Sequence, residues 1–179
     1  MTEHAPSDVM ALAAAIKLVV FDVDGVLTDG RLLLGPAGEE YKQFHVRDGH
    51  GMVMLRETGI ELAIISGRES PVVAKRMDEL GIRFVYQGCR EKLDVLDKLC
   101  ATLGVAHQEV CFVGDDFPDL RPLRAVGLPI AVADAHPTVC AAARYVTHTN
   151  GGFGAAREVA ELILHAQGAL ARFISTTRD

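Results

Sequence analysis

Residues 16–21 (IKLVVF) form the feature that most restricts what this chain can fold into. The run is apolar and rich in strand-forming residues, and only Lys17 interrupts it. Such a short run is typical of a strand that is buried on both faces of a parallel sheet. Asp22, Asp24 and Gly25 follow it directly, and open α/β sheets bind their ligands outside the carboxyl ends of the strands. The stretch therefore predicts a ligand site at this strand end, although two aspartates there could also serve only as turn formers.

The rest of the chain alternates between short apolar runs and helix-like patterns. We expect a helix that begins near Ser7 within an N-terminal helix or arm at 1–15. Further strands are expected at 61–65, 83–86, 109–113, 129–132 and 145–147. Further helices are expected at 48–58, 71–80, 91–103, 119–126, 137–143 and 155–167. This alternation predicts a doubly wound, mostly parallel α/β sheet, and a length of 179 residues favours a single domain over 1–179.

Residues 31–46 interrupt this alternation between the first strand and its helix. Two short extended segments, 31–34 and 41–46, flank the turn sequence GPAGEE, which predicts a β-hairpin. We expect Lys42 to pair with Glu39 or Glu40 across this hairpin. Because its strands are mostly apolar and an isolated hairpin is marginally stable in water, the insert is expected to pack against copies of itself in an oligomer. Residues 168–179 are expected to form a tail beyond the last helix, with terminal disorder as the plain alternative.

Composition narrows the class of protein. No run of 18 apolar residues is present, so no membrane span is expected. Residues 10–15 (MALAAA) lack the basic flank of a signal peptide. The four cysteines form no CxxC pair, which favours a reducing, cytoplasmic setting without disulfides or zinc. A net charge of −6 argues against a nucleic-acid partner.

Side chains suited to phosphoryl transfer stand at predicted strand ends or at the start of the following helix. They are Asp22, Asp24, Ser66, Lys92, Asp115, Asp116 and Asp119. Phosphoryl transfer to an aspartate requires a carboxylate nucleophile and a hard divalent cation, which cancels the repulsion between that carboxylate and the phosphate. The residue types at these strand ends therefore predict a metal-dependent phosphoryl-transfer site.

The same chemistry assigns a role to each group. Mg²⁺ prefers oxygen ligands, and the carboxylates of Asp22 and Asp115 together with the backbone carbonyl of Asp24 fit that preference. Lys92 and Ser66 are of the type that holds phosphoryl oxygens. The Asp24 side chain is the candidate acid that protonates the leaving alcohol.

The ordered motifs resemble those of the haloacid dehalogenase superfamily. DVDGVLT at 22–28, Ser66, Lys92 and GDDxxD at 114–119 match its four motifs in order. The resemblance implies a Rossmann-like parallel sheet and a Mg²⁺-dependent aspartyl phosphatase. It makes Asp22 the nucleophile and Asp24 the general acid and base. Asp115 becomes a metal ligand. Asp116 and Asp119 are expected to contact the metal ligands without binding the ion directly, or to reach the ion through water.

A longer pattern resembles the capless phosphatases of this superfamily that act on sugar-acid phosphates. It comprises DVDGVLTDG at 22–30, GEE at 38–40, Lys42, FHVRDGHG at 44–51, SGR at 66–68 and GGFGAAREV at 151–159. The resemblance implies hydrolysis of 3-deoxy-D-manno-octulosonate 8-phosphate in lipopolysaccharide precursor synthesis. It further implies a cytoplasmic homotetramer without a cap domain, in which the tail helps to cover a neighbouring active site.

Four side chains are candidates for contact with the sugar: Thr28, Arg68, Asp48 and His50. Each has a plain structural alternative. Arg68 could be a solvated helix-start arginine, Asp48 could be an N-cap, and His50 could be a surface or packing residue. The glycines in GGFG are expected to form a loop into the last helix, not a dinucleotide-binding fingerprint, because the acidic partner of that fingerprint is missing.

Two other functions compete with this prediction. One is a phosphatase for a related nonulosonate 9-phosphate. The other is a non-enzymatic phospho-acceptor module of the receiver type, in which the acceptor aspartate lies on a middle strand and paired acids lie on the first strand. Here the DxD sequence follows the first strand and the paired acids come late, which favours the enzyme. The chain contains no Walker A sequence and no HExxH sequence, which excludes the corresponding NTPase and zinc protease.

Overall fold

The computed structural model, which describes residues 6–175, contains a six-stranded sheet in the order β5-β4-β1-β6-β7-β8. All neighbouring strands in this sheet are parallel. The strands are β1 (Leu18–Phe21), β4 (Glu61–Ile65), β5 (Phe84–Tyr86), β6 (Val110–Gly114), β7 (Leu128–Ala131) and β8 (Tyr145–Val146). The predicted fold class, an α/β fold with a parallel sheet and a hairpin after the first strand, is confirmed.

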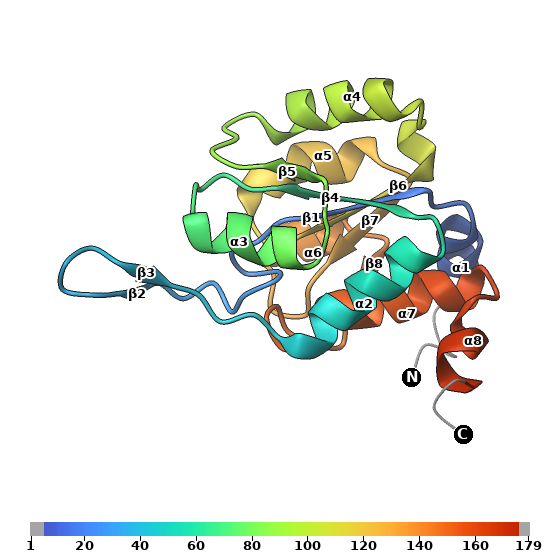
Figure 1. Ribbon diagram of the computed structural model, residues 1–179. Helices are drawn as coiled ribbons and strands as arrows, with labels where there is room; N and C mark the ends of the chain where they lie inside the picture. Colours follow the sequence, from blue (N-terminus) through green and yellow to red (C-terminus); the bar gives the residue numbers. More distant parts are fainter. Residues whose placement is uncertain (1–5, 176–179) are drawn as a thin grey trace.

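Helices cover both faces of the sheet. They are α1 (Ser7–Ala14), α2 (Val46–Glu57), α3 (Pro71–Glu79), α4 (Lys92–Leu103), α5 (Leu120–Ala125), α6 (Pro137–Ala142), α7 (Ala155–Ala166) and α8 (Leu170–Ser175), with short 3₁₀ helices η2 (His107–Glu109) and η3 (Phe117–Asp119). Helix α7 packs against α1 and α2 on one side, and α4 packs against α5 on the other (Figure 1).

Strand β1 is the centre of the core. All four of its residues are buried, and it pairs with β4 on one side and β6 on the other, so that Val20 lies opposite Ala63 and Phe112. A strand with neighbours on both edges and helices on both faces has no polar surroundings, which explains its continuous apolar sequence. The register brings the ends of β1 and β6 to the same edge of the sheet.

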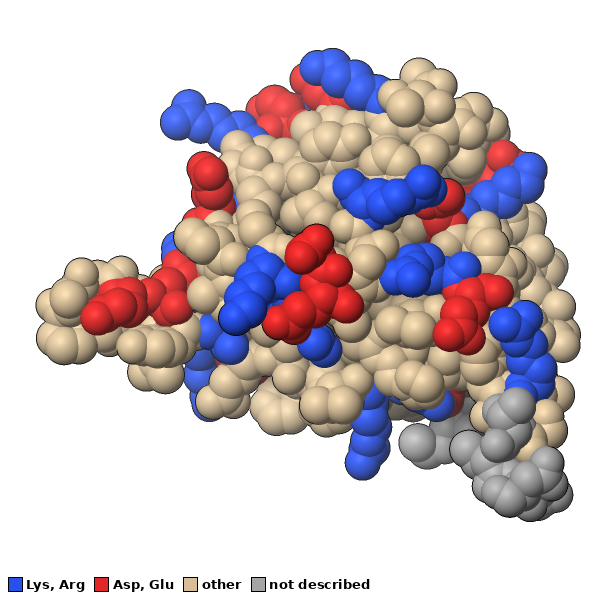
Figure 2. All heavy atoms as spheres, viewed as in Figure 1, with Lys and Arg blue, Asp and Glu red and all other residues tan. Residues whose placement is uncertain are grey.

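The hairpin is shorter than its sequence suggested. Its strands are β2 (Leu33–Leu34) and β3 (Glu40–Tyr41), not 31–34 and 41–46. Residues 42–45 form neither strand nor helix and lead into α2. This helix begins at Val46, two residues before its expected start, and His45 Nδ1 there accepts a hydrogen bond from Arg47 N at 3.2 Å. The hairpin projects from the body, and the face seen in Figure 2 combines uncharged surface with acidic side chains that lie along it. Within residues 6–175 no cap domain covers the sheet edge.

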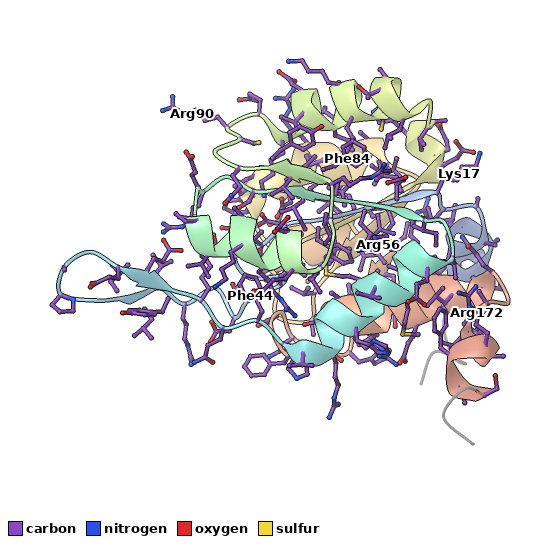
Figure 3. All side chains as sticks on the ribbon, in the orientation of Figure 1. Lys17, Phe44, Arg56, Phe84, Arg90 and Arg172 are labelled. Carbon is purple, nitrogen blue, oxygen red and sulfur yellow. The ribbon has the colours of Figure 1, made fainter. Side chains whose placement is uncertain are left out.

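The C-terminal segment also differs from expectation. Where a tail was predicted from residue 168, the chain forms α8, because Leu170 and Phe173 pack against the core and Arg172 Nη2 donates to the Glu57 carbonyl at 3.3 Å. Helix α8 lies at the end of the molecule opposite the hairpin (Figures 1 and 3). Residues 1–5 of the predicted arm and 176–179 of the predicted tail lie outside the described residues.

The helices and the cysteines of the described residues bear on two further expectations. None of the helices within 6–175 is long and apolar enough to cross a membrane. All four cysteines are unpaired, and Cys111 is buried in β6.

Candidate active site

The acidic residues predicted for metal binding meet at the ends of two adjacent strands. Asp22 follows β1, and Asp115 follows β6, the next strand in the sheet. The 3₁₀ helix η3 adds Asp119, and carboxylate oxygens of all three lie within 4.8 Å of one another. Three acids gathered this closely repel one another unless a cation or protons balance their charge. The cluster is therefore a candidate site for a divalent cation.

The loop after β1 turns sharply to make this approach possible. The amides of Val26, Leu27 and Thr28 all donate to the carbonyl of Val23, at 3.2, 2.9 and 3.0 Å. Gly25 adopts a φ of +94°, a left-handed conformation that favours glycine. The loop therefore folds over the end of β1.

Lys92 is the cation that the structure itself places in the cluster. Its Nζ lies 2.9 Å from Asp22 Oδ1 and 2.7 Å from Asp119 Oδ1, and its side chain is buried. Burial opposes its protonation, but the carboxylates of Asp22 and Asp119 outweigh burial and raise the pKa of Lys92. A permanent positive charge beside Asp22 suits the predicted role of Lys92 as a phosphate holder.

Lys92 does not balance the whole negative charge of the cluster, and the pKa values of Asp22 and Asp115 are raised. Burial, with repulsion from Asp119, raises the pKa of Asp22 to about 6 against the attraction of Lys92. Burial, with repulsion from Asp22 and Asp119, raises the pKa of Asp115 to about 8. In addition, Asp22 Oδ1 is buried without a hydrogen bond of normal geometry from any described residue. An additional cation would stabilise both ionised carboxylates, so the residues present fit a divalent metal ion.

Asp119 serves the geometry of the site through hydrogen bonds. Its Oδ2 accepts from the amides of Asp115 and Asp116 at 3.1 and 3.4 Å, while Oδ1 contacts Lys92. Gly114 permits this packing, because a β-carbon there would lie 2.5 Å from the Asp119 β-carbon. Asp119 therefore holds both the lysine and the loop that carries Asp115. The side chain of Asp116 is exposed.

Asp24 lies in a second group of charges, on the hairpin side of the loop. Lys42 Nζ contacts Asp24 Oδ1, and Arg68 Nε lies 3.5 Å from Asp24 Oδ2. Glu40 joins both cations, with its Oε1 2.9 Å from Lys42 Nζ and its Oε2 3.0 Å from Arg68 Nη2. The predicted Lys42–Glu40 pair is confirmed, but its link to Asp24 was missed, because hairpin length and direction are not encoded in any local motif.

Two of the predicted sugar contacts make bonds within the fold. Asp48 Oδ1 accepts from the Arg157 amide at 2.8 Å, so this buried side chain caps the first turn of α7. Burial raises the pKa of Asp48. The Thr28 hydroxyl donates to the Val23 carbonyl and accepts from the Gly30 amide, each at 3.3 Å. His50 is exposed on α2, and Ser66 is buried where β4 ends, with its carbonyl accepting from the Cys89 amide at 3.0 Å.

The glycine loop before α7 packs against the loop after β1, and the sequence did not reveal this contact. A β-carbon on Gly151 would lie 1.7 Å from the Gly25 carbonyl oxygen, and one on Gly152 would lie 2.4 Å from the Asp29 amide nitrogen. Gly152 also donates to the Val26 carbonyl at 2.9 Å. The paired glycines were the available signal, because two adjacent glycines at a strand-to-helix connection often mark close backbone approach.

One carboxylate anchors this loop. Glu158, in the first turn of α7, accepts from the amides of His148 and Thr149 at 2.9 and 3.1 Å, and from the hydroxyls of Thr149 and Tyr145 at 2.7 and 2.8 Å. Burial opposes ionisation of this carboxylate, but these hydrogen bonds outweigh it and lower the pKa of Glu158. The loop is thus tied to the start of α7.

Known proteins of similar sequence and structure are hydrolases and phosphatases, in agreement with the candidate site. Residues 85–158 match the family model for haloacid dehalogenase-like hydrolases. The chain is 48% identical to 3-deoxy-D-manno-octulosonate 8-phosphate phosphatase KdsC of Escherichia coli K12 over 92% of this chain and 87% of that protein. A probable YrbI family phosphatase from Pseudomonas syringae is 49% identical with a TM-score of 0.96, over 97% of this chain and 99% of that one.

A further relative has been solved with ligands. The phosphatase from Moraxella catarrhalis, in complex with magnesium ion, phosphate ion and KDO, is 42% identical with a TM-score of 0.94, over 96% of this chain and 98% of that one. Identity at this level over nearly the whole length of both chains shows common family membership. The chain belongs to the 3-deoxy-D-manno-octulosonate 8-phosphate phosphatase family of haloacid dehalogenase-like hydrolases.

Proposed function

We propose that this protein hydrolyses 3-deoxy-D-manno-octulosonate 8-phosphate to the free sugar acid and inorganic phosphate, as a step in lipopolysaccharide precursor synthesis. The reaction proceeds through a phosphorylated Asp22. One observation carries the mechanism: Asp22 stands at the end of β1 with Lys92 Nζ at 2.9 Å and with Asp115 and Asp119 beside it. This arrangement supplies a nucleophile, a phosphate holder and a metal site within one cluster.

Asp22, Asp115 and the backbone carbonyl of Asp24 are the groups that we assign to Mg²⁺. Asp22 Oδ1 is buried, and its contact with Lys92 is an ion pair that lacks hydrogen-bond geometry. This oxygen and the raised pKa values of Asp22 and Asp115 support the assignment. The bound ion supplies positive charge that lets two ionised carboxylates and a phosphate occupy one site. Lys92 and Ser66 hold the phosphoryl oxygens, and Asp119 keeps Lys92 in place at 2.7 Å.

In the first step, a carboxylate oxygen of Asp22 attacks phosphorus while the bond between phosphorus and the sugar oxygen breaks. The Asp24 carboxyl group donates its proton to that sugar oxygen, so that the sugar acid leaves as a neutral alcohol at this position. The products of this step are the acyl phosphate of Asp22, the free sugar acid and an ionised Asp24.

In the second step, water attacks the phosphorus of the acyl phosphate and the bond to the Asp22 oxygen breaks. Asp24, now a carboxylate, accepts the proton of the attacking water and regains its starting form. Phosphate leaves and Asp22 returns as a carboxylate. Two aspartates two positions apart therefore divide the work into nucleophile and proton carrier.

Arg68 is the group that we assign to the sugar carboxylate. It follows β4 at the same sheet edge as Asp22, and 46% of its side chain is exposed. Guanidinium groups bind carboxylates in a fixed planar geometry. Its partners Asp24 and Glu40 already hold it at the site, so that the incoming carboxylate meets a prepositioned cation.

The proposed function is tested by phosphate release across a panel of esters with Mg²⁺. We expect the highest kcat/KM with 3-deoxy-D-manno-octulosonate 8-phosphate, ahead of a nonulosonate 9-phosphate and of glucose 6-phosphate. A preference for the nonulosonate 9-phosphate would replace the substrate but keep the mechanism. A single phosphorylation without repeated phosphate release would instead favour the phospho-acceptor module.

We further propose a cytoplasmic homotetramer in which the hairpins meet. Leu33, Leu34 and Tyr41 are more than half exposed on the projecting hairpin, and large apolar side chains gathered there favour contact with another copy. Because α8 lies at the far end from the hairpin, we propose that this C-terminal segment covers the active site of a neighbouring copy and not its own. Light scattering tests the assembly, and deletion of residues 169–179 should keep the tetramer but change KM or product release. An active monomer would contradict the whole arrangement.

A further inference from the structure

Lys42 is a buried lysine that the family motifs do not assign to the reaction. Its side chain is 1% exposed, although it stands at the base of an otherwise exposed hairpin. Its Nζ contacts Asp24 Oδ1 and lies 2.9 Å from Glu40 Oε1. The ammonium group is therefore held between two fixed acids.

Asp24, which Lys42 contacts, is the residue that donates and accepts a proton in the proposed reaction. A general acid works only when its oxygen lies within hydrogen-bond reach of the leaving oxygen. Asp24 lies in a loop turned by Gly25, and its carboxylate has one cation at each oxygen, namely Lys42 at Oδ1 and Arg68 Nε at 3.5 Å from Oδ2. Rotation of the carboxylate would break both contacts.

The two cations are not equivalent during turnover. Arg68 is 46% exposed and is the group assigned to the sugar carboxylate, so bound substrate competes with Asp24 for this cation. Lys42 is buried and remains. Glu40 keeps Lys42 in place, and its second oxygen lies 3.0 Å from Arg68 Nη2. With substrate bound, Lys42 is the cation left to fix the direction of the Asp24 carboxylate.

We propose that Lys42 is a positioning residue that aims the Asp24 carboxyl group at the leaving oxygen, so that the hairpin takes part in catalysis through its base. This inference rests on the proposed function. It gives the insert after β1 a second task beside assembly: Glu40 and Lys42, at the end where the chain returns from the hairpin, complete the acid and base of the reaction.

The experiment compares Lys42→Met and Lys42→Arg with the matched control Lys17→Met. Lys17 also pairs with a carboxylate, because its Nζ lies 2.6 Å from Glu109 Oε1. It directly precedes β1, at the opposite end of that strand from the site. With the sugar phosphate, we expect Lys42→Met to lower kcat by roughly 10–100-fold, a part of the 10²–10⁴-fold that general acid–base assistance contributes. KM should stay within about twofold, Lys42→Arg should recover part of the rate, and Lys17→Met should match the wild type.

A double variant separates positioning from a general structural role. If Lys42 acts through Asp24, then adding Lys42→Met to Asp24→Asn should lower kcat no further than Asp24→Asn alone. With p-nitrophenyl phosphate, whose leaving group needs no proton, Lys42→Met should keep the first-turnover burst of p-nitrophenol while the steady rate falls. A misfolded variant would lose the burst as well. Glu40→Gln tests the Lys42–Asp24 contact in a second way, because Glu40 holds Lys42 in place. Glu39→Gln is the control at the neighbouring position.

Two outcomes would overturn the inference while leaving the proposed function intact. One is a wild-type kcat in both Lys42→Met and Glu40→Gln. The other is a double variant whose kcat loss equals the product of the two single losses, because independent effects multiply. Failure of the wild-type protein to release phosphate from any ester would instead contradict the proposed function itself.

Discussion

Gly25 lies directly against the carboxylate of Asp115. A β-carbon at position 25 would be 2.1 Å from Asp115 Oδ2, and the backbone there has a φ of +94°. The turn after β1 and the acid after β6 therefore share one space. Close approach of these two loops brings Asp22, the proposed nucleophile, and Asp115, a proposed metal ligand, into a single site.

The first prediction follows from this contact. Gly25→Ala should weaken Mg²⁺ binding and turnover, because the added methyl group displaces Asp115, and the strained backbone should cost roughly 1–3 kcal/mol of unfolding free energy. Isothermal titration with Mg²⁺ measures the first effect. The control is Gly38→Ala, which has a φ of +90° but open space around it. It should keep Mg²⁺ affinity, and equal losses in both variants would contradict the role of the clash.

The second prediction concerns pH and the metal. Burial and repulsion from neighbouring carboxylates, Asp119 in both cases, raise the pKa of Asp22 to about 6 and that of Asp115 to about 8, from 3.8. The folded protein therefore binds these protons more tightly than the unfolded chain. Their contribution to stability is complete below the unfolded value and is lost as pH rises through about 6 and then about 8. Without metal, the ionised acid cluster should therefore destabilise the folded protein most in alkaline solution.

Mg²⁺ should therefore raise the melting temperature more at about pH 8.5 than at about pH 5.5, because the ion competes with protons for the same carboxylates. Thermal unfolding with and without Mg²⁺ measures this difference, and Asp115→Asn should remove most of it. An equal Mg²⁺ effect at both pH values would place the metal elsewhere.

The third prediction tests the assignment of the sugar carboxylate. Arg68→Ala should raise KM for 3-deoxy-D-manno-octulosonate 8-phosphate more than for an ester without a carboxylate, since a lost charge-assisted contact costs about 1.5–3 kcal/mol. The matched control is Arg90→Ala. Arg90 is also exposed, on the loop before α4, and points away from the body of the protein (Figure 3). Equal KM changes for both substrates would assign Arg68 to the phosphate or to Asp24.

The fourth prediction concerns the loop that backs the site. Glu158→Gln should lower the unfolding free energy by about 1.5–3 kcal/mol, because the carboxylate accepts several hydrogen bonds that an amide cannot all retain. Urea denaturation measures the loss. Glu161→Gln is the control on the same helix, since Glu161 pairs with Arg157 Nε at 2.7 Å on the partly exposed surface. A Glu158 variant no less stable than the Glu161 variant would show that the loop keeps its conformation without the Glu158 hydrogen bonds.

The sequence predicted those parts of the fold whose cause is local. The buried β1 run, the order of strands and helices, and the acids at the strand ends all follow from periodicity and from the geometry of parallel sheets. The start of α2 was misplaced, because its N-cap is His45 and Asp48 caps a different helix, 109 residues away.

The missed contacts depend on tertiary placement. Lys42 and Asp24 are 18 residues apart and meet because of the direction in which the hairpin leaves the sheet. Gly151 meets Gly25 because β8 and the loop after β1 end at the same edge. Neither a helical nor a strand period records such a relationship. Chemistry-bearing residue types could be read from the chain, whereas the residues that orient them could not.

The most direct test of the mechanism is to identify the phosphorylated residue. The protein is mixed with radiolabelled sugar phosphate and Mg²⁺, quenched in acid within the first turnover, and digested for peptide mapping. We expect the label as an acyl phosphate on Asp22, more of it in Asp24→Asn, and none in Asp22→Asn, which should also lose turnover after mass spectrometry has excluded deamidation. Turnover in Asp22→Asn, or wild-type turnover without label on Asp22, would contradict the account.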